Sequence, residues 1–208
     1  MYYVEFFFRY FHVLAGIVWI GMLYYFNFVQ TEYFKEAEAG AKSDAMAKLA
    51  PRALWWFRWG AMLTFLTGAY LFHKIGALGT TMPAIWVGAL AGTLMFLNVW
   101  LVIWPNQQIV LGMKEGDGPA AAAKAGLASR TNTLFSGPML LGMLGNKYLA
   151  VPIAEGGSAT GLYVALGAIV ALEINALFGG MGPMKSVMGV IHSSLALMLV
   201  ILGILLYV

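Results

Sequence analysis

Two of the three histidines lie where they could share one haem iron. His12 is near the start of the first apolar segment, and His73 is near the end of the second. If these segments are antiparallel helices, the two residues lie at a similar depth. Neutral imidazoles from facing helices are what a b-type haem iron binds on its two sides. We therefore predict haem b on His12 and His73, with the haem iron as the only metal that they bind.

The surroundings of this pair are rich in phenyl rings, and His73 has a second interpretation. As a residue at a helix end beside Lys74, His73 could simply lie at the membrane interface. The rings that could wall a cofactor are those of Phe6, Phe7, Phe8, Phe11 and Phe72.

A second polar group is expected in the cytoplasmic half of the membrane. Glu173 lies about one and a half turns before the end of the fifth apolar segment. His192 lies equally far into the sixth, so the two share a depth. A carboxylate in hydrocarbon is costly without a partner, and Arg130 or His192 is the expected one. We predict that Glu173, His192 and Arg130 are catalytic, and that the amides at this depth bind substrate: Asn27, Asn98 and Asn132.

The same group of residues has a purely structural interpretation. Buried ion pairs often only hold helices together, and here they would join the fourth, fifth and sixth segments. The functional interpretation is a site that binds a polar or anionic small molecule or relays protons. Arg58 has the same depth, but we expect its long side chain to reach the interface beside Trp55 and Trp59.

The elements that position these residues are expected to be membrane helices. Of the 208 residues, 61% are hydrophobic and only 10% are charged, whereas soluble domains have about 25% charged residues. About 20 apolar residues suffice to cross a bilayer. The chain is therefore predicted to be all-α, a polytopic membrane bundle forming one domain over residues 1–208. Six spans are expected, at about 6–29, 54–75, 84–104, 127–148, 160–178 and 187–208.

The connections between the spans have their own predicted structure. Residues 31–53 are expected to form a polar loop, and the third span is expected to stop at Pro105. The fourth span is the weakest, with Pro138 inside it and the alanines 120–123 as its frayed beginning. Glycines at close spacing are interpreted as helix-packing positions. These are Gly60 and Gly68, Gly88 and Gly92, and Gly142 and Gly145.

The basic residues predict the orientation. With six spans, the connections at 31–53, 105–126 and 179–186 share one side and contain most of the lysines. Basic loops stay in the cytoplasm, so both termini are expected outside. Interfacial tryptophans would mark the cytoplasmic side: Trp55, Trp56, Trp59 and Trp104.

Four strings in the chain are distinctive when taken together: FHVLAGIVWIGMLYYFNFVQ, LAPRALWWFRWGAMLTFLTG, NVWLVIWPNQQIVLG and ASRTNTLFSGPMLL. Over about residues 8–145 the chain resembles the membrane domain of the bacterial urate oxidase (urate hydroxylase) that is fused to a cytochrome c. The last two spans match less clearly. The first string also resembles the first helix of HemJ-type protoporphyrinogen oxidases and of copper-resistance membrane proteins.

The resemblance implies a redox function. The expected location is a bacterial inner membrane, with both termini periplasmic as the basic loops predict. In the fused enzymes the resemblance implies oxidation of urate to 5-hydroxyisourate, with electrons leaving through the c-type haem. The chain has no cysteine and therefore no CxxCH motif. Either a separate cytochrome c or other redox subunit receives the electrons, or the urate chemistry does not carry over. Urate or a similar anionic heterocycle is the implied substrate. The positions within the shared strings are His12, Asn27, Trp104, Asn106, Arg130, Thr131 and Asn132.

The sequence leaves other functions open. A non-catalytic accessory subunit of a larger respiratory membrane complex would use its small-residue faces for packing and bind no cofactor. A small-molecule transporter or channel would use the polar group as its pathway. The expected partners are the lipid bilayer and a redox protein, and no nucleic acid. A homo-oligomer is also left open.

Overall fold

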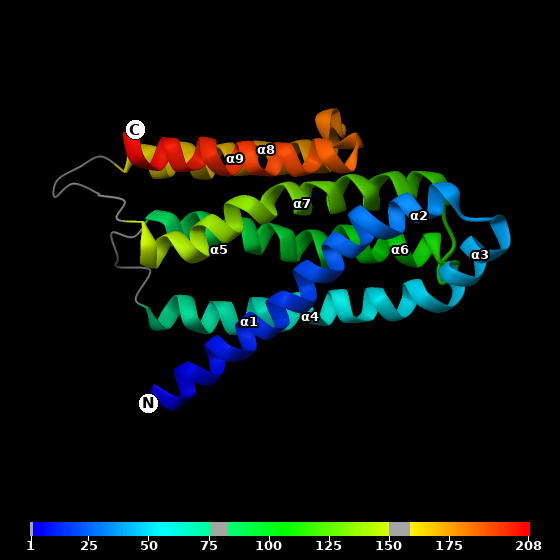
Figure 1. Ribbon diagram of the computed structural model, residues 1–208, viewed down its shortest axis with the longest axis horizontal. Coiled ribbons are helices and arrows are strands. Elements are labelled where there is room, and N and C mark those ends of the chain that lie inside the picture. Colours follow the sequence, from blue (N-terminus) through cyan, green and yellow to red (C-terminus); the bar gives the residue numbers. More distant parts are fainter. Residues whose placement is uncertain (1, 76–82, 150–158) are drawn as a thin grey trace. The chain divides into compact units, whose positions relative to one another are not determined.

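A computed structural model describes residues 2–75, 83–149 and 159–208, and all regular structure in these ranges is helical (Figure 1). The chain begins with one continuous helical stretch, which contains a π-helical segment in its last third. It comprises α1 (Tyr2–Tyr24), η1 (Tyr25–Gln30) and α2 (Thr31–Glu36). A second run leads into the next long helix through α3 (Ala39–Asp44), the π-helical η2 (Ala45–Leu49) and α4 (Ala50–Lys74).

The rest of the described chain is also built from long helices. The third run is again interrupted by a π-helix, and comprises α5 (Pro83–Leu97), η4 (Asn98–Ile103) and α6 (Trp104–Val110). The last part of the chain contains α7 (Gly118–Tyr148), α8 (Thr160–Phe178), the short 3-10 helix η5 (Gly182–Lys185) and α9 (Val187–Tyr207). Each of the six predicted spans therefore falls on a long helical run.

The predicted polar loop at residues 31–53 is wrong, because most of this segment is helical. Its alanine, glutamate and lysine residues have high helix propensity, and this outweighed their polarity. The predicted stop at Pro105 is also wrong, because the helix continues to Val110. Pro105 lies where the π-helix η4 continues into α6, and a proline inside a membrane helix is tolerated when neighbouring groups satisfy the freed backbone. Pro138 is accommodated inside α7, as expected.

Four of the described helical runs are long and apolar enough to cross a membrane: Tyr3–Glu36, Pro83–Val110, Thr160–Phe178 and Val187–Tyr207. Two more helices, α4 with 25 residues and α7 with 31, exceed the required length but contain more polar residues. The prediction of an all-α membrane bundle is confirmed. The count of six crossings and their direction stay predictions.

Many large apolar side chains on these helices are exposed. Ile17 on α1 is 66% exposed, Leu101 in η4 69%, and Leu199 on α9 61%. Apolar surface on this scale is unusual for a soluble monomer, whereas lipid solvates it without penalty. The chain is therefore a membrane protein.

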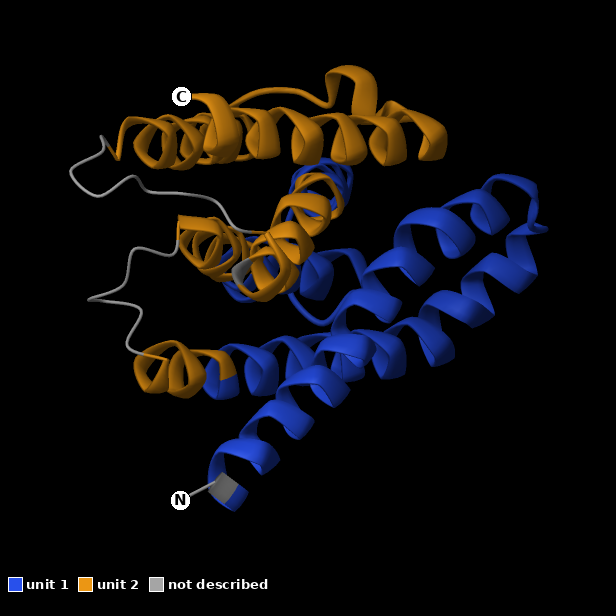
Figure 2. Ribbon diagram, turned by 60° about the vertical axis from the view of Figure 1, so that its left-hand side comes forward, with its two compact units in different colours: residues 1–67, 96–130 blue, residues 68–95, 131–208 orange. Residues whose placement is uncertain are grey.

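The chain divides into two compact units, coloured separately in Figure 2. Unit 1 contains residues 1–67 and 96–130, and unit 2 contains residues 68–95 and 131–208. The predicted single domain over 1–208 stays a prediction. In unit 1, α1 crosses α4 where Gly60 meets the backbone of Trp19, and Phe26 packs edge-on against Phe57.

Unit 2 is packed through small residues. Gly88 of α5 lies against Gly142 of α7, so the predicted packing function of both glycines is confirmed. Gly161 of α8 faces the carbonyl oxygen of Ile204 in α9. These two helices lie side by side (Figure 1). The predicted turn between the second and third spans falls at residues 76–82, outside the described residues.

Candidate functional site

His12 is half-buried in unit 1 and bonded to α4. Its Nδ1 lies 2.9 Å from the carbonyl oxygen of Thr64 and 3.1 Å from the hydroxyl of Thr67. A carbonyl oxygen only accepts hydrogen bonds, so Nδ1 must donate. In the neutral ring Nε2 then has no proton and presents its lone pair. Metal-binding histidines commonly have this arrangement, in which a backbone carbonyl fixes the tautomer and the ring orientation.

His73 has a different setting. It lies in the last turn of α4 and is exposed, and it belongs to unit 2, whereas His12 belongs to unit 1. Neither the shared haem nor the interfacial interpretation of His73 is tested by these positions, so both stay open.

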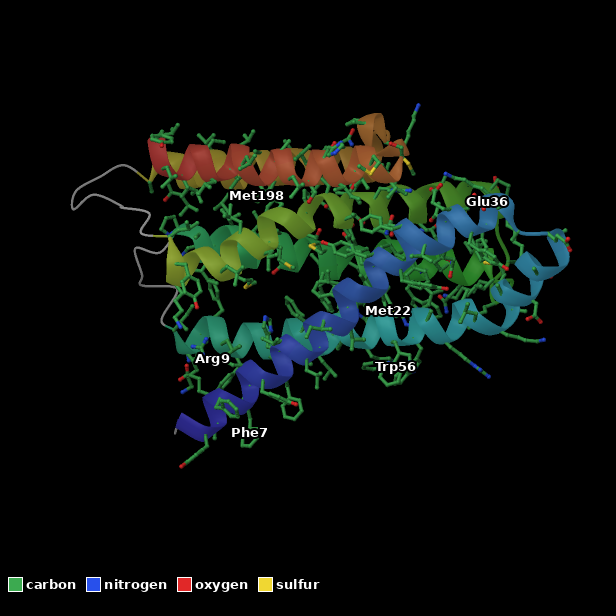
Figure 3. The ribbon with its side chains drawn as sticks, viewed as in Figure 1. Phe7, Arg9, Met22, Glu36, Trp56 and Met198 are labelled. Carbon is green, nitrogen blue, oxygen red and sulfur yellow. The ribbon has the colours of Figure 1, made fainter. Side chains whose placement is uncertain are left out.

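An apolar groove of about 620 Å³ runs along the crossing of α1 and α4 in unit 1. Its lining does not include His12, although it includes Thr67, whose hydroxyl lies 3.1 Å from Nδ1 of His12. Figure 3 shows Phe7 and Trp56 pointing outward from these two helices. The lining consists of Phe7, Phe8, Phe11, Leu14, Ala15, Val18, Trp55, Trp56, Trp59, Gly60, Leu63 and Thr67.

Three residues of the predicted catalytic and substrate-binding group lie in unit 1 and are buried. Asn27, in the π-helix η1, donates from Nδ2 to the hydroxyl of Ser129 at 2.8 Å and to the carbonyl of Leu23 at 2.9 Å. Asn98, in the π-helix η4, is 1% exposed. Arg130 is 5% exposed and interacts electrostatically with Glu32, while its Nη1 is buried without a hydrogen-bond partner. Asn27 and Asn98 thus both lie in π-helical stretches, and such stretches often mark functional sites.

Arg58 stacks on Trp104, and its expected place at the interface stays a prediction. Its guanidinium carbon lies 3.3 Å from the ring centroid of Trp104, and its Nε and Nη1 are buried without partners. Trp104 is therefore covered by a guanidinium group, and its place in the interfacial belt stays a prediction. Trp55 and Trp56 remain exposed, as a belt at the interface requires.

The other three residues of the predicted catalytic and substrate-binding group lie in unit 2. Asn132 is fully buried and donates from Nδ2 to the carbonyl of Met95 at 2.9 Å, which joins α7 to α5. Glu173 lies on the buried side of α8 and is 8% exposed. His192 is exposed on α9, two positions from the buried Val190 and therefore on the opposite side of that helix.

The predicted residues are thus divided between the units. Unit 1 contains Arg130, Asn27 and Asn98, and unit 2 contains Glu173, His192 and Asn132. Sequence reasoning did not find the contact of Arg58 with Trp104, which contains several N–H donors. The sequence does show an arginine within an apolar span, and an ionisable residue in such a place usually has a function. Within the described ranges, no three His, Cys, Asp or Glu side chains group together to hold a metal ion.

The family model described as "Urate oxidase N-terminal" matches residues 77–205, more than half of the chain. The match covers α5 to α9, including the last two helices, which resembled the family less clearly in the sequence. It begins after α4, so His12 and Arg58 lie before it, whereas Arg130, Asn132, Glu173 and His192 lie within it. No curated protein and no solved structure matches the chain.

Proposed function

Because the chain belongs to the urate oxidase N-terminal family, we propose that it is a membrane-embedded redox module that oxidises urate or a similar anionic heterocycle. The family match over residues 77–205 is the observation that carries this proposal. Hydroxylation of urate by water gives 5-hydroxyisourate, two protons and two electrons. A partner protein such as a cytochrome c would take the electrons.

The residues of the chain would bind the anion and move its protons. Arg130 is buried with an unused donor and would hold a negatively charged oxygen of the ring. Amides such as Asn27 and Asn98 would orient the heterocycle. Glu173 or His192 would accept a proton as water adds, which is ordinary general-base chemistry.

Haem b is proposed on His12, with His73 as the second candidate ligand. The fit rests on Nδ1 of His12, whose hydrogen bond to the Thr64 carbonyl leaves Nε2 available to iron. A bound haem would supply one-electron transfer between the substrate and the redox partner. The proposed location is a bacterial inner membrane, with both termini periplasmic.

An optical spectrum of the purified protein tests the haem. A reduced-minus-oxidised band near about 560 nm is expected for b-type haem. His12→Ala should abolish the band, and His192→Ala, at an exposed histidine of unit 2, should leave it intact. A band that survives in His12→Ala would exclude this residue as the ligand, and a flat wild-type spectrum would exclude the haem.

Turnover of urate tests the activity. The wild-type protein, supplied with an oxidised cytochrome c, should consume urate and reduce the cytochrome. Arg130→Gln and Glu173→Gln should remove turnover while the protein stays folded, and Arg52→Gln, at an exposed arginine of α4, is the matched control. No turnover with any acceptor, together with a flat spectrum, would favour the accessory-subunit function.

A further inference from the structure

The contact between α4 and α6 in unit 1 contains a guanidinium group that forms no ion pair with another residue of the described ranges. Arg58 stacks on Trp104 at 3.3 Å, and both Nε and Nη1 are buried without an acceptor. The ion pairs among the described residues join Arg9 to Glu5, Lys35 to Glu32 and Lys48 to Asp44, and none includes Arg58. The aromatic face attracts the cation but cannot accept its in-plane N–H groups.

A third donor belongs to the same contact. Trp100 lies four positions before Trp104 in the run η4–α6 and packs edge-on against Trp59, with ring centroids 5.7 Å apart. Trp59 directly follows Arg58 on α4. The indole Nε1 of Trp100 is also buried without an acceptor. Three buried N–H donors therefore lie along one helix–helix contact, and buried donors are normally paired.

A chain of contacts places Arg58 at the level of the predicted site in unit 1. Phe57, the neighbour of Arg58, packs against Phe26, with ring centroids 5.7 Å apart. Asn27 follows Phe26 and binds the hydroxyl of Ser129, which precedes Arg130. Arg130, unlike Arg58, has an acidic group close enough to interact with it, namely Glu32.

We propose that Arg58, oriented by its stack on Trp104, is a second residue of unit 1, besides Arg130, that binds an anionic planar ring substrate. A guanidinium fork donates two parallel hydrogen bonds, and a urate-type monoanion presents adjacent nitrogen and oxygen acceptors in one plane. Trp100 supplies a further donor. This inference rests on the proposed function, which it deepens by adding a specificity-determining residue.

A lipid phosphate is the other source of an anion. Nε and Nη1 of Arg58 are buried, whereas a headgroup would need donors that are open at the membrane surface. The test uses the full-length protein in nanodiscs of neutral phosphatidylcholine, and repeats it in nanodiscs that contain anionic phosphatidylglycerol. Binding that requires the anionic lipid and does not occur with urate would overturn the inference.

Urate binding is measured by calorimetry and by the rise of Tm with urate concentration, because a ligand of the folded state raises Tm by mass action. We expect Arg58→Gln and Arg58→Lys to weaken urate binding by about tenfold or more, since each loses the fork. Arg52→Gln should bind like the wild type. Neutral caffeine, with a similar ring system and no charge, should bind weakly to every variant.

The lysine variant separates binding from folding, because it retains the cation over the Trp104 ring. If the role of Arg58 is only structural, Arg58→Lys will lower Tm without urate and leave the urate-dependent rise of Tm unchanged. That result would overturn the inference. Unchanged affinity in Arg58→Lys, or no urate binding by the wild type, would overturn it as well. Arg58-dependent binding without any oxidation would support this inference and count against the proposed function.

Discussion

Three polar residues inside the apolar helices are bonded to backbone or to a small hydroxyl. His12 donates to the Thr64 carbonyl, Asn27 to Ser129, and Asn132 to the Met95 carbonyl. In hydrocarbon an unsatisfied polar group is costly, so these bonds hold the helices in one register. The sequence predicted that these residues turn inward. Their partners depend on helix phase and therefore appeared only in the structure.

The Asn27–Ser129 bond gives a prediction at this scale. Asn27→Ala and Ser129→Ala should each lower the free energy of unfolding, and a double-mutant cycle should give a coupling of about 0.6 kcal/mol and at most about 1.7 kcal/mol. Unfolding in detergent by urea or SDS measures it. A coupling near zero would show that the hydrogen bond at 2.8 Å contributes no specific stability.

At the scale of elements, close backbone approach distinguishes two kinds of glycine. A Cβ added at Gly142 of α7 would meet the carbonyl oxygen of Ala84 at 2.5 Å and would also meet the backbone of Gly88. Backbone atoms cannot move aside as a flexible side chain can. By contrast, Gly167 on α8 has no atom within 4 Å of such a Cβ. Only the first glycine is required by packing.

Alanine substitution at these two glycines should therefore have opposite effects. Gly142→Ala should destabilise unit 2 by about 1–3 kcal/mol through overpacking. Gly167→Ala should be neutral or should stabilise by up to about 1 kcal/mol, because alanine has the higher helix propensity. Thermal unfolding in detergent measures both. Equal stability of the two variants would contradict the close packing of α5 against α7.

Three π-helical stretches in the described part of the chain are the second feature at this scale. They lie at Tyr25–Gln30, Ala45–Leu49 and Asn98–Ile103, and the first and last contain the buried Asn27 and Asn98. A π-turn shifts the phase of the residues that follow it, so it changes which side chains face inward. Hydrophobic periodicity does not reveal such a shift, and this explains why the sequence could not predict how Trp100 and Trp104 face α4.

For the whole molecule, the open question is the number and direction of the crossings. Four helical runs have the composition of spans, and α4 and α7 are long enough to add two more. With six crossings both termini lie on one side, and the basic connections lie on the other. This arrangement is what would place Glu173 and His192 at a common depth.

The absence of cysteine makes this topology directly testable. Single cysteines at the exposed Ser43, Asp117 and Lys185 should react with an impermeant maleimide only in inside-out vesicles. Cysteines at Tyr3 and Val208 should react only in right-side-out vesicles. Labelling of Tyr3→Cys and Val208→Cys on opposite sides would establish an odd number of crossings.

The sequence by itself determined the helical class, the membrane environment and the places of the long helices, because apolar run length and composition decide whether a segment prefers lipid. It also identified the inward-turning polar residues, since their burial in hydrocarbon demands a reason. The tertiary structure alone decided which side chains meet. Arg58 stacks on Trp104, and His192 lies on the exposed side of α9 while Glu173 is buried. Those outcomes depend on the rotation of each helix about its axis, which π-turns and glycine contacts set and which depth along the helix leaves open.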